Sequence, residues 1–353
     1  MRNINIIIII IITILLMNAC LPIPPQPPKS IYEITIKDCK EIVPSNPNSI
    51  YTKRAYHTVI YIYKFYVYII GGTQDGGAGL NDVWYSENGA DWELATGNAE
   101  FSPRWGHTSI FKDDKIWVIG GTENGVTGLN DVWYSENGVD WELATGNAEF
   151  SPRWGHTSVF KDGKIWVIGG TQDGVTGLND VWYSENGLTW HIATGTAGFS
   201  KRWYHESIVH IDYNYDTDVP EYYDNILVIG GTQDGITGLN DVWSSKNGIN
   251  WQVVTSAAGF GKRYGHKCDL ALYVPQFIIL IGGKDNDKYY NDIWWTKDEK
   301  TWKKINYNCS FNPRAGFGLL NNTIYGAIYG GYDGNNYFND RWYIFFEHVE
   351  IYM

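Results

Sequence analysis

The chain has little of what several protein classes require. Only 4 of its 353 residues are cysteine, which excludes a small scaffold held together by disulfides. Acidic side chains (39) outnumber basic ones (27), the formal net charge is −12, and lysine and arginine do not cluster. Nucleic-acid binding needs a basic face for the phosphates, so we expect no nucleic-acid partner. No phosphate-binding loop, G-x-S-x-G or H-E-x-x-H motif is present.

Aromatic residues are abundant. The chain holds 17 tryptophans and 26 tyrosines against 3 methionines, and 44% of its residues are hydrophobic. Bulky aromatics suit the pleated surface of a sheet better than a helix, and this hydrophobic content exceeds that of a disordered chain. Composition therefore predicts a folded, acidic, β-rich protein.

Residues 1–19 are typical of a signal peptide rather than of a folded domain. Arg2 supplies a short positive region, and residues 6–17 are apolar except for Thr13. This run is shorter than the roughly 20 residues that span a bilayer. It has the length of the hydrophobic part of a secretion signal.

The signal ends at Ala19-Cys20, which resembles the lipobox of bacterial lipoproteins, although Met17 and Asn18 depart from the usual pattern. The resemblance implies a lipidated Cys20 and a place in the bacterial cell envelope, at the outer membrane, cell surface or periplasmic face. Residues 20–30 follow as a tether, because five of the 12 prolines lie in residues 21–28 and favour a stiff, extended spacer. The alternative is ordinary cleavage after Ala19, which leaves a free Cys20.

The rest of the chain is a sixfold repeat. Residues 80–122 and 129–171 differ at only three positions, and each repeat has a glycine pair, then Asn-Asp-x-Trp. An arginine precedes each pair, and in five repeats a second tryptophan comes eight residues after the first. The glycine pairs are Gly71-Gly72, Gly120-Gly121, Gly169-Gly170, Gly230-Gly231, Gly282-Gly283 and Gly330-Gly331.

Each repeat predicts four short strands. In the second repeat these are residues 107–111, 116–120, 131–135 and 141–144. Asn137-Gly138 predicts a tight hairpin between the last two. Units of about 50 residues with four strands each are typical of propeller blades.

The repeats resemble the kelch motif, because Arg104-Trp105-Gly106-His107, the β-rich run ending in Gly120-Gly121, and a fourth-strand tryptophan recur in register. The resemblance implies an all-β fold for residues 31–353: a six-bladed kelch-type β-propeller with four antiparallel strands per blade, the first strand innermost. We expect the glycine pair to pass close under the fourth-strand tryptophan.

The last blade lacks a clear outer strand. Residues 31–43 or residues 349–353 could supply it, and we favour the N-terminal segment because the C-terminal one lacks the Asn-Gly turn. Beyond Cys20, the remaining cysteines are an odd set, so one pair could form a disulfide that the sequence does not select: Cys39, Cys268 and Cys309.

Residues repeated in every blade are interpreted first as scaffold. Five histidines share one register, where the sixth repeat has Phe317, so we expect packed histidines and no metal site. The six arginines are expected to form blade-to-blade ion pairs with the Asn-Asp-x-Trp aspartates, the alternative being a ring that binds carboxylates. The histidines are His57, His107, His156, His205 and His266.

One face of the propeller carries the candidate ligand site. The loops entering the blades place an aromatic residue after the arginine in four repeats, and the loops between second and third strands open on the same face. Such a surface suits a glycan or a peptide, and the alternative is that the aromatics wedge between blades. The candidate residues are Trp105, Trp154, Trp203, Tyr264, Arg104, Arg153, Arg202, Arg263, Gln74, Asp75, Gln172, Asp173, Gln233 and Asp234.

Blade four breaks the repeat with an acidic, tyrosine-rich insertion around residues 212–224, which favours a solvated loop over a calcium site. We assign no catalytic residue and no cofactor. The leading hypothesis is a membrane-anchored extracytoplasmic binding module for a glycan or protein. The alternative is a sugar-processing enzyme of the sialic-acid mutarotase type, which predicts a channel-mouth pocket where a carboxylate of raised pKa lies beside an arginine.

Overall fold

The computed structural model describes residues 31–62, 66–214, 221–271, 277–307, 309–321 and 325–351. The predicted signal peptide and tether and the centre of the blade-four insertion lie outside these residues. Residues 36–347 form one compact unit, and residues 1–35 and 348–353 form the other. Of the second unit, the structure describes residues 31–35 of strand β1 and residues 348–351 of strand β26. Within the described residues, no helix is long and apolar enough to cross a membrane.

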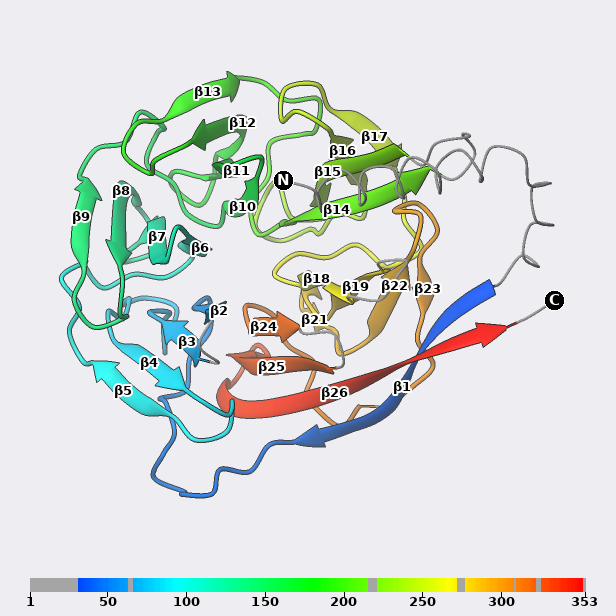
Figure 1. Cartoon of the computed structure of the whole chain (residues 1–353), viewed down its shortest axis with the longest axis horizontal. Helices are drawn as coiled ribbons and strands as arrows, with labels where there is room; N and C mark the ends of the chain where they lie inside the picture. Colours follow the sequence, from blue (N-terminus) through cyan, green and yellow to red (C-terminus); the bar gives the residue numbers. More distant parts are fainter. Residues whose placement is uncertain are drawn as a thin grey trace, which may run out of the picture. The chain divides into compact units, whose positions relative to one another are not determined.

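Residues 36–347 form six four-stranded antiparallel sheets that follow one another around an axis (Figure 1). The predicted fold is therefore confirmed. The first three blades consist of β2 (Thr58–Ile62), β3 (Tyr66–Ile70), β4 (Val83–Ser86) and β5 (Glu93–Thr96); β6 (Thr108–Lys112), β7 (Lys115–Thr122), β8 (Gly128–Ser135) and β9 (Glu142–Thr145); and β10 (Thr157–Lys161), β11 (Lys164–Thr171), β12 (Gly177–Ser184) and β13 (His191–Thr194).

The other three blades deviate more from the repeat. Blade four has a longer first hairpin, and blade five carries a small extra hairpin, β20 (Lys284–Asp285) and β21 (Lys288–Tyr289). Their strands are β14 (Glu206–Asn214), β15 (Glu221–Ile229), β16 (Val242–Ser245) and β17 (Gln252–Thr255); β18 (Lys267–Ala271), β19 (Phe277–Ile281), β22 (Ile293–Thr296) and β23 (Lys303–Lys304); and β24 (Gly318–Asn321), β25 (Tyr325–Tyr332), β26 (Tyr337–Ile351) and β1 (Ile31–Glu41).

The N-terminal segment closes the ring. The strand order of the sixth sheet is β1-β26-β25-β24, so β1 is the outer strand of a blade whose other strands come from the end of the chain (Figure 1). The amide of Ile42 donates to the carbonyl of Arg341 at 2.8 Å. A disulfide joins Cys39 on β1 to Cys309, and Cys268 is free and buried. The structure thus confirms the favoured terminus and selects the cysteine pair.

Burial within the blades follows from the sequence pattern. Second strands are apolar on both sides, because each packs against the neighbouring blade on both faces; Ile165, Val167 and Ile168 of β11 have no exposed surface. Fourth-strand tryptophans lie edge-on against a phenylalanine of the loop entering the same blade, as in Phe150 and Trp190, whose ring centres are 5.0 Å apart.

The prediction that the glycine pairs pass close under the fourth-strand tryptophan was wrong. A Cβ on Gly121 would meet the Cβ of His107 at 2.8 Å, and one on Gly120 would meet the carbonyl of Arg153 at 2.9 Å, so the crowding comes from the inner histidine and the next loop. Both glycines also have positive φ, 56° and 105°. Backbone geometry and close approach, not the fourth-strand tryptophan, therefore require glycine here.

Candidate functional site

All six arginines are buried in ion pairs. Each has no exposed surface and forms paired bonds to the aspartate of Asn-Asp-x-Trp, with closest N–O distances of 2.5–2.8 Å. The pair lies inside one blade, which corrects the predicted blade-to-blade geometry: Arg104 bonds Asp131 and the carbonyl of Gly120, both in blade two. Only the backbone of Arg104 bonds across the seam between blades one and two, where its amide donates to the carbonyl of Leu80.

This pairing keeps the aspartates ionised. Burial of Asp131 opposes ionisation, but the Arg104 guanidinium and the indole N–H of Trp133 outweigh it and lower the pKa of that carboxylate. The same groups lower the pKa of the corresponding aspartates in blades three to five. With both donors and both carboxylate oxygens occupied, the structure leaves none of these arginines available to a ligand.

The aromatic residues that follow the arginines are wedges. Trp105, Trp154, Trp203 and Tyr264 are only 1–6% exposed. The Trp105 indole N–H donates to the carbonyl of Gly77 in the blade-one loop, and the Tyr264 hydroxyl donates to Gly235 of blade four at 2.6 Å. These side chains join neighbouring loops, which corrects the expectation that they form exposed platforms.

The predicted loop aspartates are turn formers with exposed neighbours. The Asp173 carboxylate accepts from the amides of Val175 and Thr176 at 2.9 and 2.7 Å, and this lowers its pKa. Equivalent bonds are made by Asp75 and Asp234. Gln74, Gln172 and Gln233, by contrast, are exposed.

These turns display apolar tips that the sequence argument missed. Val126, Val175 and Ile236 follow the loop glycine in blades two, three and four and are 63%, 76% and 60% exposed. Three such aliphatic side chains at one register of consecutive blades make this face a candidate binding surface. The signal was their recurrence at one register between a glycine and a threonine. We call the surface made by these loops and the blade-entry loops the loop face.

Blades five and six contribute tyrosines to the loop face. Tyr332 stacks on Tyr337 with ring centres 4.5 Å apart, and Tyr289 meets Tyr332 edge-on at 6.0 Å. The Lys284 ammonium lies 4.9 Å from the Tyr289 ring centre, and burial lowers the pKa of Lys284. All four side chains are partly exposed. Tyrosine and aliphatic groups of this kind are typical of protein interfaces.

A ring of backbone hydrogen bonds surrounds the channel where the blade-entry loops meet the first strands. One residue per blade donates its amide to the carbonyl of its counterpart in the preceding blade, at 2.6–3.0 Å, and the bond from Tyr56 to Gly316 completes the circle. All six residues have φ between 51° and 62°. They are Tyr56, Gly106, Gly155, Tyr204, Gly265 and Gly316.

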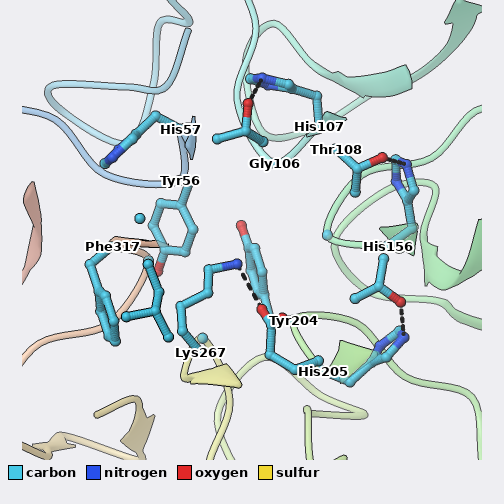
Figure 2. Close-up of a pocket in the computed structure, with 18 of the residues that line it drawn as sticks. Tyr56, His57, Gly106, His107, Thr108, His156, Tyr204, His205, Lys267 and Phe317 are labelled. Atoms are coloured by element: carbon cyan, nitrogen blue, oxygen red, sulfur yellow. Dashed lines mark hydrogen bonds and ion pairs between the residues drawn. The ribbon is translucent and has the colours of Figure 1, made fainter. Parts of the chain in front are cut away.

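Two of these six positions hold tyrosine although the geometry favours glycine. Positive φ costs a tyrosine about 1–3 kcal/mol, so we expect a compensating role. The rings of Tyr56 and Tyr204 meet at 4.9 Å and lie across the middle of the channel (Figure 2). The sequence signal was a glycine register interrupted twice, in blades one and four.

Below that ring, the inner histidines link neighbouring blades. His107, His156 and His205 each bond a threonine hydroxyl of the preceding blade at 3.0–3.2 Å, which confirms packed, hydrogen-bonded side chains at these positions (Figure 2). Burial first, then the blade's own arginine, lowers the pKa of His107 and His205 to about 3. In the described part of the chain, no three histidine, cysteine, aspartate or glutamate side chains gather to hold a metal ion.

The threonine register breaks in blades four to six. Its members are Thr58, Thr108 and Thr157, then Glu206, Lys267 and Gly318. The Lys267 ammonium bonds the Glu206 carboxylate at 2.7 Å inside the channel, and burial raises the pKa of Glu206. The enzyme hypothesis predicted such a carboxylate beside an arginine at the channel mouth; its partner here is a lysine.

The sequence is similar to known kelch proteins. The family profile described as the KLHDC2/KLHL20/DRC7 kelch-repeats domain matches residues 24–216, more than half of the chain. The chain belongs to the kelch-repeat family. Kelch domains generally mediate protein interactions, so this propeller is a protein-interaction module by family.

A curated relative supports the same repeat. An F-box/kelch-repeat protein of Arabidopsis thaliana is 28% identical over 102 residues, a match that covers 26% of this chain and 20% of the relative. The kelch chain described here therefore spans a small part of that protein's length.

Proposed function

We propose that this kelch propeller binds a protein ligand through its loop face. The observation that carries the proposal is the exposure of Val126, Val175 and Ile236 on three consecutive blades, each held by an aspartate or asparagine turn. Three apolar tips spread over three blades suit an extended polypeptide better than a single sugar, which needs stacked aromatics and converging polar groups.

The tyrosine cluster extends this surface across the axis. Tyr56, Tyr204, Tyr289, Tyr332 and Tyr337 are partly exposed, and each has an apolar ring and a hydroxyl. Such rings add large contact area at low cost in side-chain entropy. The loop face would thus offer an aliphatic arc beside a tyrosine-rich centre, with the exposed glutamines as polar contacts.

The first test removes the apolar tips. The triple variant V126S/V175S/I236S is expected to lose at least about 2 kcal/mol of ligand binding, roughly thirtyfold in Kd, because hot spots of an interface are few and apolar. Photo-crosslinkers at position 175 would identify the ligand, and titration of that ligand would give the Kd for each variant.

A matched control lies on the third-to-fourth strand turns. Val139, Leu188 and Ile249 are also exposed aliphatics next to a turn glycine, at 42–51% exposure, but on the opposite face. The variant V139S/L188S/I249S should bind as the unmodified protein does. Equal loss in both triple variants, or crosslinks to glycans alone, would contradict protein binding by the loop face.

We propose further that Cys20 anchors the domain outside the cytoplasm through lipid. The supporting features are the apolar run, Ala19-Cys20 and the proline-rich tether. A protein anchored by more than one acyl chain stays stably on the membrane. If Cys20 carries such an anchor, the protein should partition almost wholly with membranes. Expression in a bacterial host, with detergent-phase partitioning and mass spectrometry of the first peptide, should show this.

The variant C20S should move the protein to the soluble fraction, whereas Q26A in the tether should leave partitioning unchanged. An N-terminal peptide that begins at an unmodified Cys20 would refute the lipid anchor and indicate ordinary cleavage.

A further inference from the structure

The channel holds a pocket that does not follow the sixfold repeat. Its volume is about 210 Å³, and in each blade it is lined by the residue of the backbone ring and the three residues that follow. The rings of Tyr56 and Tyr204 bound it at the level of the backbone ring (Figure 2). The Lys267 side chain is 34% exposed, which shows that solvent reaches it.

Three of the six blade seams follow one pattern inside this pocket. Thr58 bonds His107 and Ser109 of the next blade, and Thr157 bonds His205 and Ser207, at 2.6–3.1 Å. Thr108 bonds His156 in the same way at 3.2 Å. The threonine hydroxyls therefore bond histidine Nε2 atoms across the three seams from blade one to blade four, whereas the Ser158 hydroxyl has no hydrogen-bond partner among the described residues.

The other seams leave polar groups without partners. Glu206 occupies the threonine position of blade four but bonds Lys267, so Nε2 of His266 has no hydrogen-bond partner among the described residues, and its ring bonds only the backbone of Ile229. Gly318 occupies the threonine position of blade six, so Nε2 of His57 likewise has no partner there, and its ring bonds only the backbone of Tyr329. Both histidines are at least 97% buried and line the pocket.

The pocket wall also has an apolar side. Phe317, Leu319 and Val59 line blades six and one, whereas Glu206 and Ser207 line blade four, which lies across a six-bladed ring from blade one. A ligand here would have one face against hydrocarbon and its edge against hydroxyls, a carboxylate and an ammonium. The volume is below the roughly 300–1,000 Å³ of pockets for drug-sized ligands, which limits it to a single ring.

The charges that line the pocket indicate a neutral ligand. Glu206 and Lys267 neutralise each other, and no other acidic or basic side chain except neutral histidine lines the pocket. Burial keeps the histidines neutral by lowering their pKa. An ion that displaces water from this pocket would have to break the Glu206–Lys267 pair or remain without a charged partner, and both cost free energy.

We propose that this channel pocket binds one neutral, polyhydroxylated ring of monosaccharide size, held by the Glu206–Lys267 pair and the unpartnered histidine Nε2 atoms. The carboxylate accepts from and the ammonium donates to neighbouring hydroxyls, and the apolar C–H face of the ring packs on Phe317 and Leu319. The pocket shares Tyr56 and Tyr204 with the loop face, but Glu206, Lys267 and the histidines that would hold the ring are not part of that face.

The test uses glucose, galactose, mannose and inositol as neutral probes, with glucuronate and glucosamine as charged analogues of the same size. Saturation-transfer NMR and calorimetry should show binding of at least one neutral probe with a Kd of about 1 mM or tighter. Its charged analogue should bind at least tenfold more weakly. Absence of binding by every neutral probe, or preference for a charged one, would overturn the proposal.

Variants then locate the site. E206T/K267T restores the residue that the repeat has in blades one to three and gives His266 a hydroxyl partner, so folding should be retained while probe affinity falls at least tenfold. The surface pair Lys164 and Glu185 supplies the control, K164T/E185T, which should bind as the unmodified protein does. The conservative E206Q should weaken binding at least fivefold. Unchanged affinity in E206Q and E206T/K267T would place the probe elsewhere and refute the site.

Discussion

Removal of the Cys39–Cys309 disulfide is expected to lower the free energy of unfolding by about 2–5 kcal/mol. The bond closes a loop of 270 residues, and the entropy that such a crosslink removes from the unfolded chain grows with loop length. It also fastens β1, the one strand of blade six that is not continuous with the others, to the segment between blades five and six. Without it, β1 can detach and expose the edge of β26.

Guanidinium unfolding of C39S/C309S against the unmodified protein measures this effect. Dithiothreitol should lower the Tm of the unmodified protein by several degrees and leave that of C39S/C309S unchanged, since Cys268 forms no disulfide. Equal stability of the two proteins under oxidising conditions would show that β1 is held by its hydrogen bonds alone.

Acidification is expected to destabilise the propeller strongly between pH 7 and pH 5.5, well above the range in which carboxylates titrate. The five inner histidines are buried, and burial lowers their pKa, to about 3 for His107 and His205. In the unfolded chain a histidine titrates near 6.5. The unfolded state therefore binds more protons throughout this interval, and stability falls as pH falls below 6.5.

The expected size is about 1 kcal/mol for each histidine over this interval, or roughly 5 kcal/mol for the five. Glu206 has the opposite effect on stability. Its pKa is raised in the folded state, so the folded protein takes up this proton at a higher pH than the unfolded chain does. The ion-paired aspartates of blades two to five have lowered pKa values and lose their contribution only at more acidic pH. Urea unfolding at half-unit pH steps gives the slope directly.

One variant isolates a single histidine. Nε2 of His266 has no hydrogen-bond partner among the described residues, and Phe317 shows that this register accepts phenylalanine. H266F should therefore fold and reduce the loss of stability between pH 7 and pH 5.5 by about 1 kcal/mol. A pH-independent stability in the unmodified protein would mean that these side chains remain hydrated.

Repetition made the fold predictable from the sequence. Six glycine pairs and six Asn-Asp-x-Trp motifs in register specify blade number, strand number and turn chemistry, because each blade meets the same local requirement. The Arg104–Asp131 pair was predicted by residue type, but its placement within one blade was not, since both arrangements use the same residues. The glycine contacts were misassigned for a related reason: sequence does not show which neighbour lies within 3 Å.

Exposure was the least predictable property of the candidate site. Trp105, Trp154, Trp203 and Tyr264 could be platforms or wedges, and only the positions of Gly77, Gly125 and Gly235 in adjacent loops show that they are wedged and buried. The exposed tips were overlooked because one aliphatic residue in a polar loop carries little signal in sequence. Its importance depends on the rigid turn beneath it.

By itself, the sequence determined the kelch repeat, the six blades, the scaffold roles of arginine and aspartate, and the segment that closes the ring. These follow from local chemistry that recurs at fixed spacing. The tertiary structure alone decided which cysteines pair, that Tyr56 and Tyr204 cross the axis, and that Glu206 and Lys267 meet in the channel. Each of these depends on distances between residues that are 61 to 270 positions apart in the chain, and no local pattern encodes those distances.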